Sequence, residues 1–206
     1  MKSLVTFGLI QNVLLEGFSL PKYVDDETAR RMWWSALEVI QKEFLSTFYK
    51  DGGLWCASPL PVINEQKYLS KLKGWLWAPE GFPSFENDNA KYLPHHHHSK
   101  NQNDNIQFSN SYSILKLNLN DGYDPFLLVI TPKFQCILTI AGSKNKKILI
   151  MRNDESSLKK VIELLDIKLS QTNLKESKSF QDHLKSLGTL NFNTEFNNNF
   201  WPNLSI

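Results

Sequence analysis

The chain has 206 residues, 41% of them hydrophobic and 12% aromatic, a composition typical of a globular domain and not of a disordered protein. Its 23 basic and 21 acidic residues give a net charge of +2, without the strong basic excess of nucleic-acid-binding proteins. No stretch approaches the roughly 18 apolar residues of a membrane-spanning helix, and two cysteines are too few for a disulfide framework. We expect a cytoplasmic protein whose partners include neither nucleic acid nor a membrane.

The first helix is predicted at Asp25, after a mixed apolar segment, residues 1–24, that we expect to be an extended lead-in. Asp25 is a good N-cap, and the acidic residues after it favour the start of a helix. Apolar side chains then recur at steps of three and four residues: Trp33, Leu37, Ile40, Phe44 and Phe48. The pattern predicts a helix that ends at Asp51-Gly52-Gly53.

Two short buried strands are expected next, at Gly53–Ala57 and Gly74–Trp77, each followed by prolines that a helix or a central strand does not tolerate. We expect a short helix between them, capped by Asn64 and running through Leu72. Residues 79–111 then lack apolar periodicity and hold four consecutive histidines, His95 to His98. A segment of that length without a pattern predicts a flexible insertion or a lid.

The centre of the fold is expected in the segment that begins at Pro125. An apolar run at Phe126–Ile130 is followed by two more, Phe134–Ala141 and Ile148–Met151, joined by a short turn that contains Gly142. Two apolar runs across such a turn predict a β-hairpin. Alternation over Ser111–Leu119 predicts a further strand at the sheet edge.

The remaining segments are predicted to be helical or irregular. Asn153 or Asp154 caps a second helix, whose apolar stripe is Leu158, Val161, Ile162, Leu165 and Leu169. Residues 170–176 look like a polar linker, and a short third helix ends at Gly188. The C-terminal tail is rich in asparagine and carries large aromatic residues.

These elements predict an α+β fold: an antiparallel sheet of about five to six strands with helices packed mainly on one face, as in GAF and PAS domains. The expected organisation is an N-terminal lead-in (1–24), a sensory α+β domain (25–170) with a flexible insertion (79–111), and a helical or irregular tail (171–206).

The candidate ligand-binding residues are four tryptophans of the N-terminal half, Trp33, Trp55, Trp75 and Trp77. Ligand pockets are commonly lined by aromatic rings, so these side chains are candidates for a cleft that takes a flat small molecule. The alternative is that the same rings fill the core between helix and sheet.

No metal site, cofactor or catalytic site is expected. Four adjacent histidines, His95 to His98, do not converge on one ion, and Cys56 and Cys136 lie in predicted strands without a basic neighbourhood. His183 lacks the acidic and proline context of a phosphoacceptor histidine and is interpreted as a surface residue. No glycine-rich phosphate loop, GxSxG elbow or HExxH motif occurs.

Two segments carry a family resemblance. They are Arg30–Leu37 continuing through Gly53–Val62, and Pro125–Phe134 with the hairpin and helix behind it. Over residues 25–169 the chain resembles the N-terminal sensory region of cyanobacterial two-component histidine kinases, and it is similar to the DICT sensory domain.

The resemblance implies a signal-sensing module that binds a small molecule or a partner, such as a kinase or response regulator, and relays a conformational change. In that family a dimerisation helix and an ATP-binding core follow; residues 1–206 contain neither, so kinase activity is not expected of this chain. The alternative is a non-catalytic interaction or assembly factor that docks through the 79–111 insertion and the aromatic tail around Phe200-Trp201-Pro202.

Overall fold

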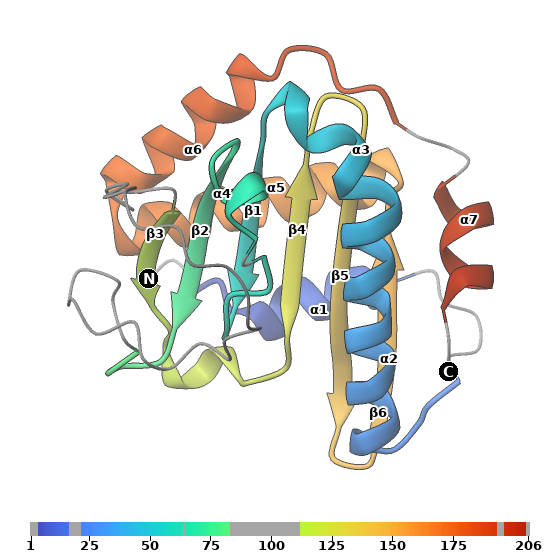
Figure 1. The fold of residues 1–206 in the computed structure, drawn as a ribbon. Helices are drawn as coiled ribbons and strands as arrows, with labels where there is room; N and C mark the ends of the chain where they lie inside the picture. Colours follow the sequence, from blue (N-terminus) through green and yellow to red (C-terminus); the bar gives the residue numbers. More distant parts are fainter. Residues whose placement is uncertain (1–3, 17–21, 64, 83–111, 193–195, 205–206) are drawn as a thin grey trace, which may run out of the picture.

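The computed structural model describes residues 4–16, 22–63, 65–82, 112–192 and 196–204, and it places a six-stranded sheet between layers of helices (Figure 1). The strand order is β3-β2-β1-β4-β5-β6. The strands are β1 Gly53–Ser58, β2 Leu72–Ala78, β3 Tyr112–Lys116, β4 Phe126–Ile130, β5 Gln135–Ser143 and β6 Lys146–Arg152. The α+β class and the number of strands are therefore confirmed, as are the edge position of β3 and the hairpin of β5 and β6.

The sheet is mixed, whereas an antiparallel sheet was predicted. β1 pairs with β2 in parallel and β2 with β3 in parallel, while the β1–β4, β4–β5 and β5–β6 pairs are antiparallel. The parallel pairs arise because the chain crosses back between them, through the short helix α4 (Gln66–Leu69) in the first case.

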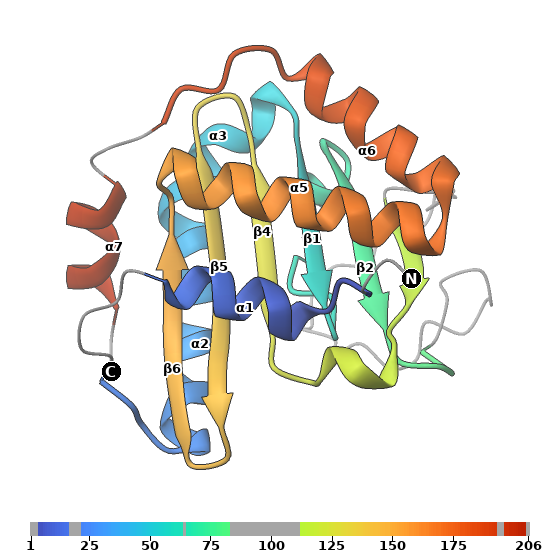
Figure 2. The same cartoon turned by 180° about the vertical axis from the view of Figure 1, so that it is seen from behind.

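Helices cover both faces of the sheet, whereas they were expected mainly on one face. Helix α2 (Asp26–Val39) lies on one face (Figure 1), and α1 (Phe7–Leu15) and α5 (Glu155–Thr172) lie on the other, where α6 (Leu174–Ser186) packs against α5 (Figure 2). All residues of β1 and β4 are buried. Strands that are apolar throughout must be covered on both sides, so their composition explains the two helical layers.

The two principal helices begin where the sequence predicts. Asp25 accepts the backbone N–H of Thr28 at 2.7 Å, and Asp154 accepts that of Ser157 at 2.9 Å. The first helical stretch continues from α2 through a π-helical segment, Ile40–Leu45, and a turn of α-helix (α3, Ser46–Phe48). It ends in a 3₁₀ turn, Tyr49–Asp51, with Gly52 as the C-cap.

Helices form in two segments that were predicted to be non-helical, the lead-in and the linker. The expected extended lead-in contains α1, which buries Phe7, Ile10 and Leu14 against the sheet. The expected linker at 170–176 is mostly helical, because α5 runs to Thr172 and α6 starts at Leu174. Helix α7 (Phe196–Asn203) buries Phe196 and Phe200 in the core of the α2 side. These segments pack onto the sheet because packing buries their apolar residues.

Most of the predicted 79–111 insertion, including His95 to His98, lies outside the described residues. Among the residues that are described, no helix is long and apolar enough to cross a membrane.

Candidate functional site

The four candidate tryptophans lie on opposite faces of the sheet. Trp33 and Trp55 belong to the core on the α2 side, and Trp75 and Trp77 belong to the core on the α5 side. The register explains the separation, because Trp55 pairs with Gly74 and neighbouring residues of β2 point to opposite faces. The structure therefore does not bring the four rings together around one pocket.

Each of these rings fills space within a core. All four side chains are at most 3% exposed. Trp55 packs against Tyr112 with ring centroids 5.3 Å apart, and Trp77 meets Phe7 edge-on at 5.4 Å. The indole N–H groups of Trp55 and Trp77 have no hydrogen-bond partner among the residues that the structure describes, which is unusual for buried donors.

Trp75 connects the sheet to α6. Its indole Nε1 donates a hydrogen bond to Glu176 Oε2 at 2.8 Å, and its ring meets Phe180 edge-on at 5.3 Å. A buried N–H that binds a carboxylate is a comparatively strong hydrogen bond, so this contact holds the N-terminal half of α6 in place.

The two cysteines are unsuited to thiolate chemistry. Cys56 and Cys136 are fully buried, and burial raises the pKa of both thiols well above the ordinary value, which keeps them protonated. Within the described ranges, no three His, Cys, Asp or Glu side chains are grouped so that they could hold a metal ion.

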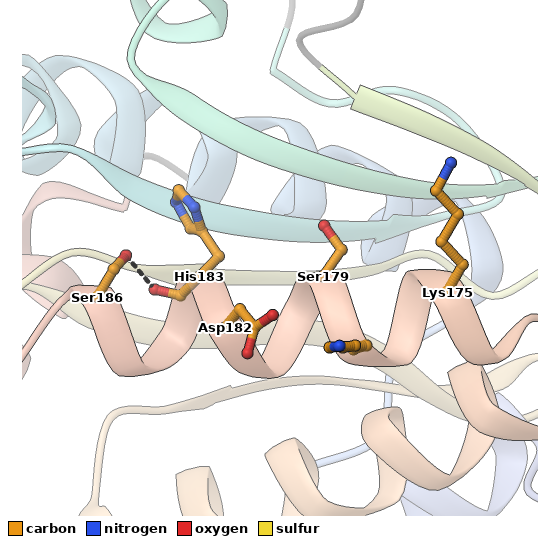
Figure 3. A pocket seen from close by; sticks show the side chains of 6 residues that line it. Lys175, Ser179, Asp182, His183 and Ser186 are labelled. Atoms are coloured by element: carbon orange, nitrogen blue, oxygen red, sulfur yellow. Dashed lines mark hydrogen bonds between the residues drawn. The ribbon is translucent and has the colours of Figure 1, made fainter.

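An open, shallow groove of about 500 Å³ runs along α6. Its lining consists of Lys175, Lys178, Ser179, Asp182, His183 and Ser186. Lys175, Ser179 and His183 project from the same side of α6 toward the strands, whereas Asp182 points in another direction (Figure 3). We call this depression the α6 groove.

Helix α6 is fixed at its start and against α5. Asn173 Oδ1 caps the helix by accepting the backbone N–H of Lys175 at 3.0 Å. Asp166 of α5 accepts hydrogen bonds from Ser177 Oγ and Gln181 Nε2, both at 2.6 Å. The groove therefore lies on a helix whose position is fixed by these hydrogen bonds.

The α6 groove offers donors to an anionic group. Lys175 and Lys178 form no ion pair with any described residue, and the hydroxyl of Ser179 is on the same helix between them and His183. Ammonium and hydroxyl groups suit a carboxylate or a phosphate, although solvent access makes each contact weak on its own.

His183 links the groove to the centre of the sheet. Its Nε2 lies 2.9 Å from the carbonyl oxygen of Gly53, the first residue of β1. Because a carbonyl only accepts, Nε2 carries the proton, and in the neutral ring Nδ1 is then the acceptor. His183 was interpreted as a surface residue; it is half-buried, and the available signal was its position three residues after the buried Phe180 on the same side of α6.

Comparison with known proteins gives a family and no further relative. No curated protein matches the chain, and no solved structure matches it. The family described as "Domain of unknown function (DUF8628)" matches residues 9–206, a range that takes in the sheet, α2 and the α6 groove. The chain therefore belongs to the DUF8628 family.

Proposed function

We propose that this chain is a non-catalytic, cytoplasmic signal-sensing module of a two-component system that binds an anionic small molecule in the α6 groove. The observation that carries the proposal is the groove itself. It combines two lysines without an ion-pair partner among the described residues with a histidine that contacts the first residue of a central strand.

The relay would start at His183. An anion near Lys175 and Lys178 favours one position of α6, and His183 transmits that position to the carbonyl of Gly53. Gly53 directly follows the helical stretch that begins with α2, so a change at this carbonyl reaches both β1 and α2. A ligand that binds one arrangement better shifts the population toward it.

Native mass spectrometry tests the proposal on protein purified from its own host without a metal column. We expect the wild-type protein to carry an acidic small molecule that the Lys175→Gln/Lys178→Gln variant lacks. The matched control is Lys144→Gln/Lys185→Gln, which removes two exposed lysines that are not in the groove. Equal retention of the ligand by all three proteins, or its absence from the wild type, contradicts the proposal.

A second candidate function is a protein-interaction module. It is favoured by two tryptophans that remain on the surface beside the core of the α2 side, Trp34 of α2, 56% exposed, and Trp201 of α7, 44% exposed. Tryptophan is enriched at the centres of protein interfaces. Copurification of a stoichiometric kinase or response regulator that is lost in Trp34→Ala/Trp201→Ala, with groove variants unaffected, would favour this function over ligand sensing.

A further inference from the structure

Helix α1 has no charged residue of its own with which to stabilise its ends. Its sequence is FGLIQNVLL, without an acidic residue in the first turn or a basic residue in the last. A helix of nine residues is too short to persist alone in water. Thr6 caps the helix by accepting the backbone N–H of Leu9 at 3.2 Å, and the other groups that hold its ends come from the rest of the domain.

The N-terminal end of α1 is held by three side chains from two other segments. Asp121 Oδ1 accepts the backbone N–H of Phe7 at 3.2 Å, and Gln171 Oε1 accepts that of Val5 at 3.0 Å. Lys168 Nζ donates to the carbonyl oxygen of Val5 at 3.1 Å. A carboxylate at the N-terminus of a helix also complements the helix dipole.

Lys168 and Asp121 form a fully buried ion pair with an Nζ–Oδ1 distance of 2.5 Å, and their side chains are 2% and 0% exposed. Nζ also lies 4.9 Å from the centre of the Phe7 ring. Nζ thus donates hydrogen bonds to Asp121 and to the Val5 carbonyl, and the Phe7 ring adds a cation–π contact. Two of these three partners belong to the α1 segment, so the buried charge keeps all three only while that segment is docked.

The C-terminal end of α1 is held by Arg152 at the end of β6. Its guanidinium donates to the carbonyl oxygen of Leu14 at 3.2 Å and to that of Glu16 at 2.7 Å. The last carbonyls of a helix have no partner within it, and a cation there complements the dipole. Lys160 of α5 adds an exposed ion pair with Glu16.

Between these two ends α1 covers part of the sheet. Phe7, Ile10 and Leu14 are almost fully buried, with Phe7 against Trp77 and Phe126. Figure 2 shows α1 lying across β5 and β6, beside α5. Loss of α1 would uncover this apolar face.

We propose that α1 is a strap that docks and undocks as one unit, with docking controlled by the buried Lys168–Asp121 pair. Undocking leaves the strands paired and exposes the apolar face beside α5. The inference is independent of the function proposed for the α6 groove, since none of the groove residues contacts α1 through a described hydrogen bond or ion pair.

Hydrogen exchange measured by mass spectrometry on the full-length protein tests the strap. Lys168→Met keeps an unbranched side chain of similar length and removes the ammonium group. In this variant we expect the amides of residues 7–15 to exchange on the order of 100-fold faster than in the wild type. Amides of β4 and β5 should keep wild-type protection. The matched control is Lys159→Met, an exposed lysine of the same helix that pairs with Glu155, which should leave α1 unchanged.

Arg152→Met tests whether α1 moves as a unit, because it acts on the opposite end. We expect the same residues, 7–15, to exchange faster. Faster exchange confined to the last turn would show fraying and overturn the proposal. Equal loss of protection in α1, β4 and β5 on replacing Lys168 would show that the pair stabilises the whole fold. Unchanged exchange of α1 would show that the pair does not hold α1. Either result would also overturn the proposal.

Discussion

Replacement of Gly74 by alanine should strain the contact that fixes Trp55 in the core. A Cβ built on Gly74 lies 2.3 Å from Cε2 and 2.5 Å from Cζ2 of Trp55. Carbon atoms in contact prefer about 3.5 Å or more, so the ring or the strand must move by about 1.2 Å. Trp55 has no free space to enter, because it is fully buried and packs on Tyr112.

We expect Gly74→Ala to lower the free energy of unfolding by about 2 kcal/mol. Overpacking of a core costs about 1–3 kcal/mol, and an overlap this severe with a fully buried ring belongs at the upper end. The better strand propensity of alanine returns about 0.5–1 kcal/mol. In urea unfolding monitored by circular dichroism, a slope of about 2 kcal/mol per molar converts this loss into a midpoint shift of about 1 M.

The control is Gly8→Ala, whose added Cβ meets nothing nearer than Thr6 Oγ1 at 3.7 Å. Alanine in this helix should stabilise the protein by up to about 1 kcal/mol. In a double-mutant cycle, Trp55→Leu should relieve Gly74→Ala by at least about 1 kcal/mol. An unchanged midpoint for Gly74→Ala, or strict additivity in the cycle, would refute the packing of Trp55 on Gly74 and reopen its assignment to a ligand pocket.

Three further predictions concern titration, capping and the anchor of α6. Because burial raises the thiol pKa of Cys56 and Cys136, only the unfolded chain releases these protons near the ordinary pKa of 9.0. The free energy of unfolding should therefore fall as pH rises above about 9, by up to about 1.4 kcal/mol per pH unit for each thiol. The urea midpoints of the wild type and of Cys56→Ala/Cys136→Ala should converge as pH rises. A difference between the two midpoints that stays constant with pH would contradict the buried thiols as the cause. Asp154→Ala should cost about 1 kcal/mol by removing the cap of α5, measured by thermal unfolding, whereas Asp154→Asn should cost little. Glu176→Ala should cost about 1–2 kcal/mol by leaving the indole N–H of Trp75 without its acceptor, and hydrogen exchange should rise first in α6; no change in α6 would contradict that role.

Local signals in the sequence determined the starts of helices and the central hairpin. Asp25 and Asp154 cap the predicted helices because a cap needs only a side chain and the backbone N–H three residues later. The hairpin of β5 and β6 is equally local: Gly142 near the end of β5 and Asn145 in the turn both have a positive φ, which glycine and asparagine tolerate best. The α+β class follows from the number and type of these elements.

Tertiary structure alone decided how the elements meet. The pairing of Trp55 with Gly74 put two of the candidate tryptophans on each face, and no periodicity within one strand specifies its register with another. The contact of His183 with Gly53 joins residues 130 positions apart, and the ends of α1 are held by Asp121, Lys168 and Arg152, which lie far from it in the sequence. The common reason is that these features depend on groups distant in sequence, which become neighbours only when both faces of the sheet are covered.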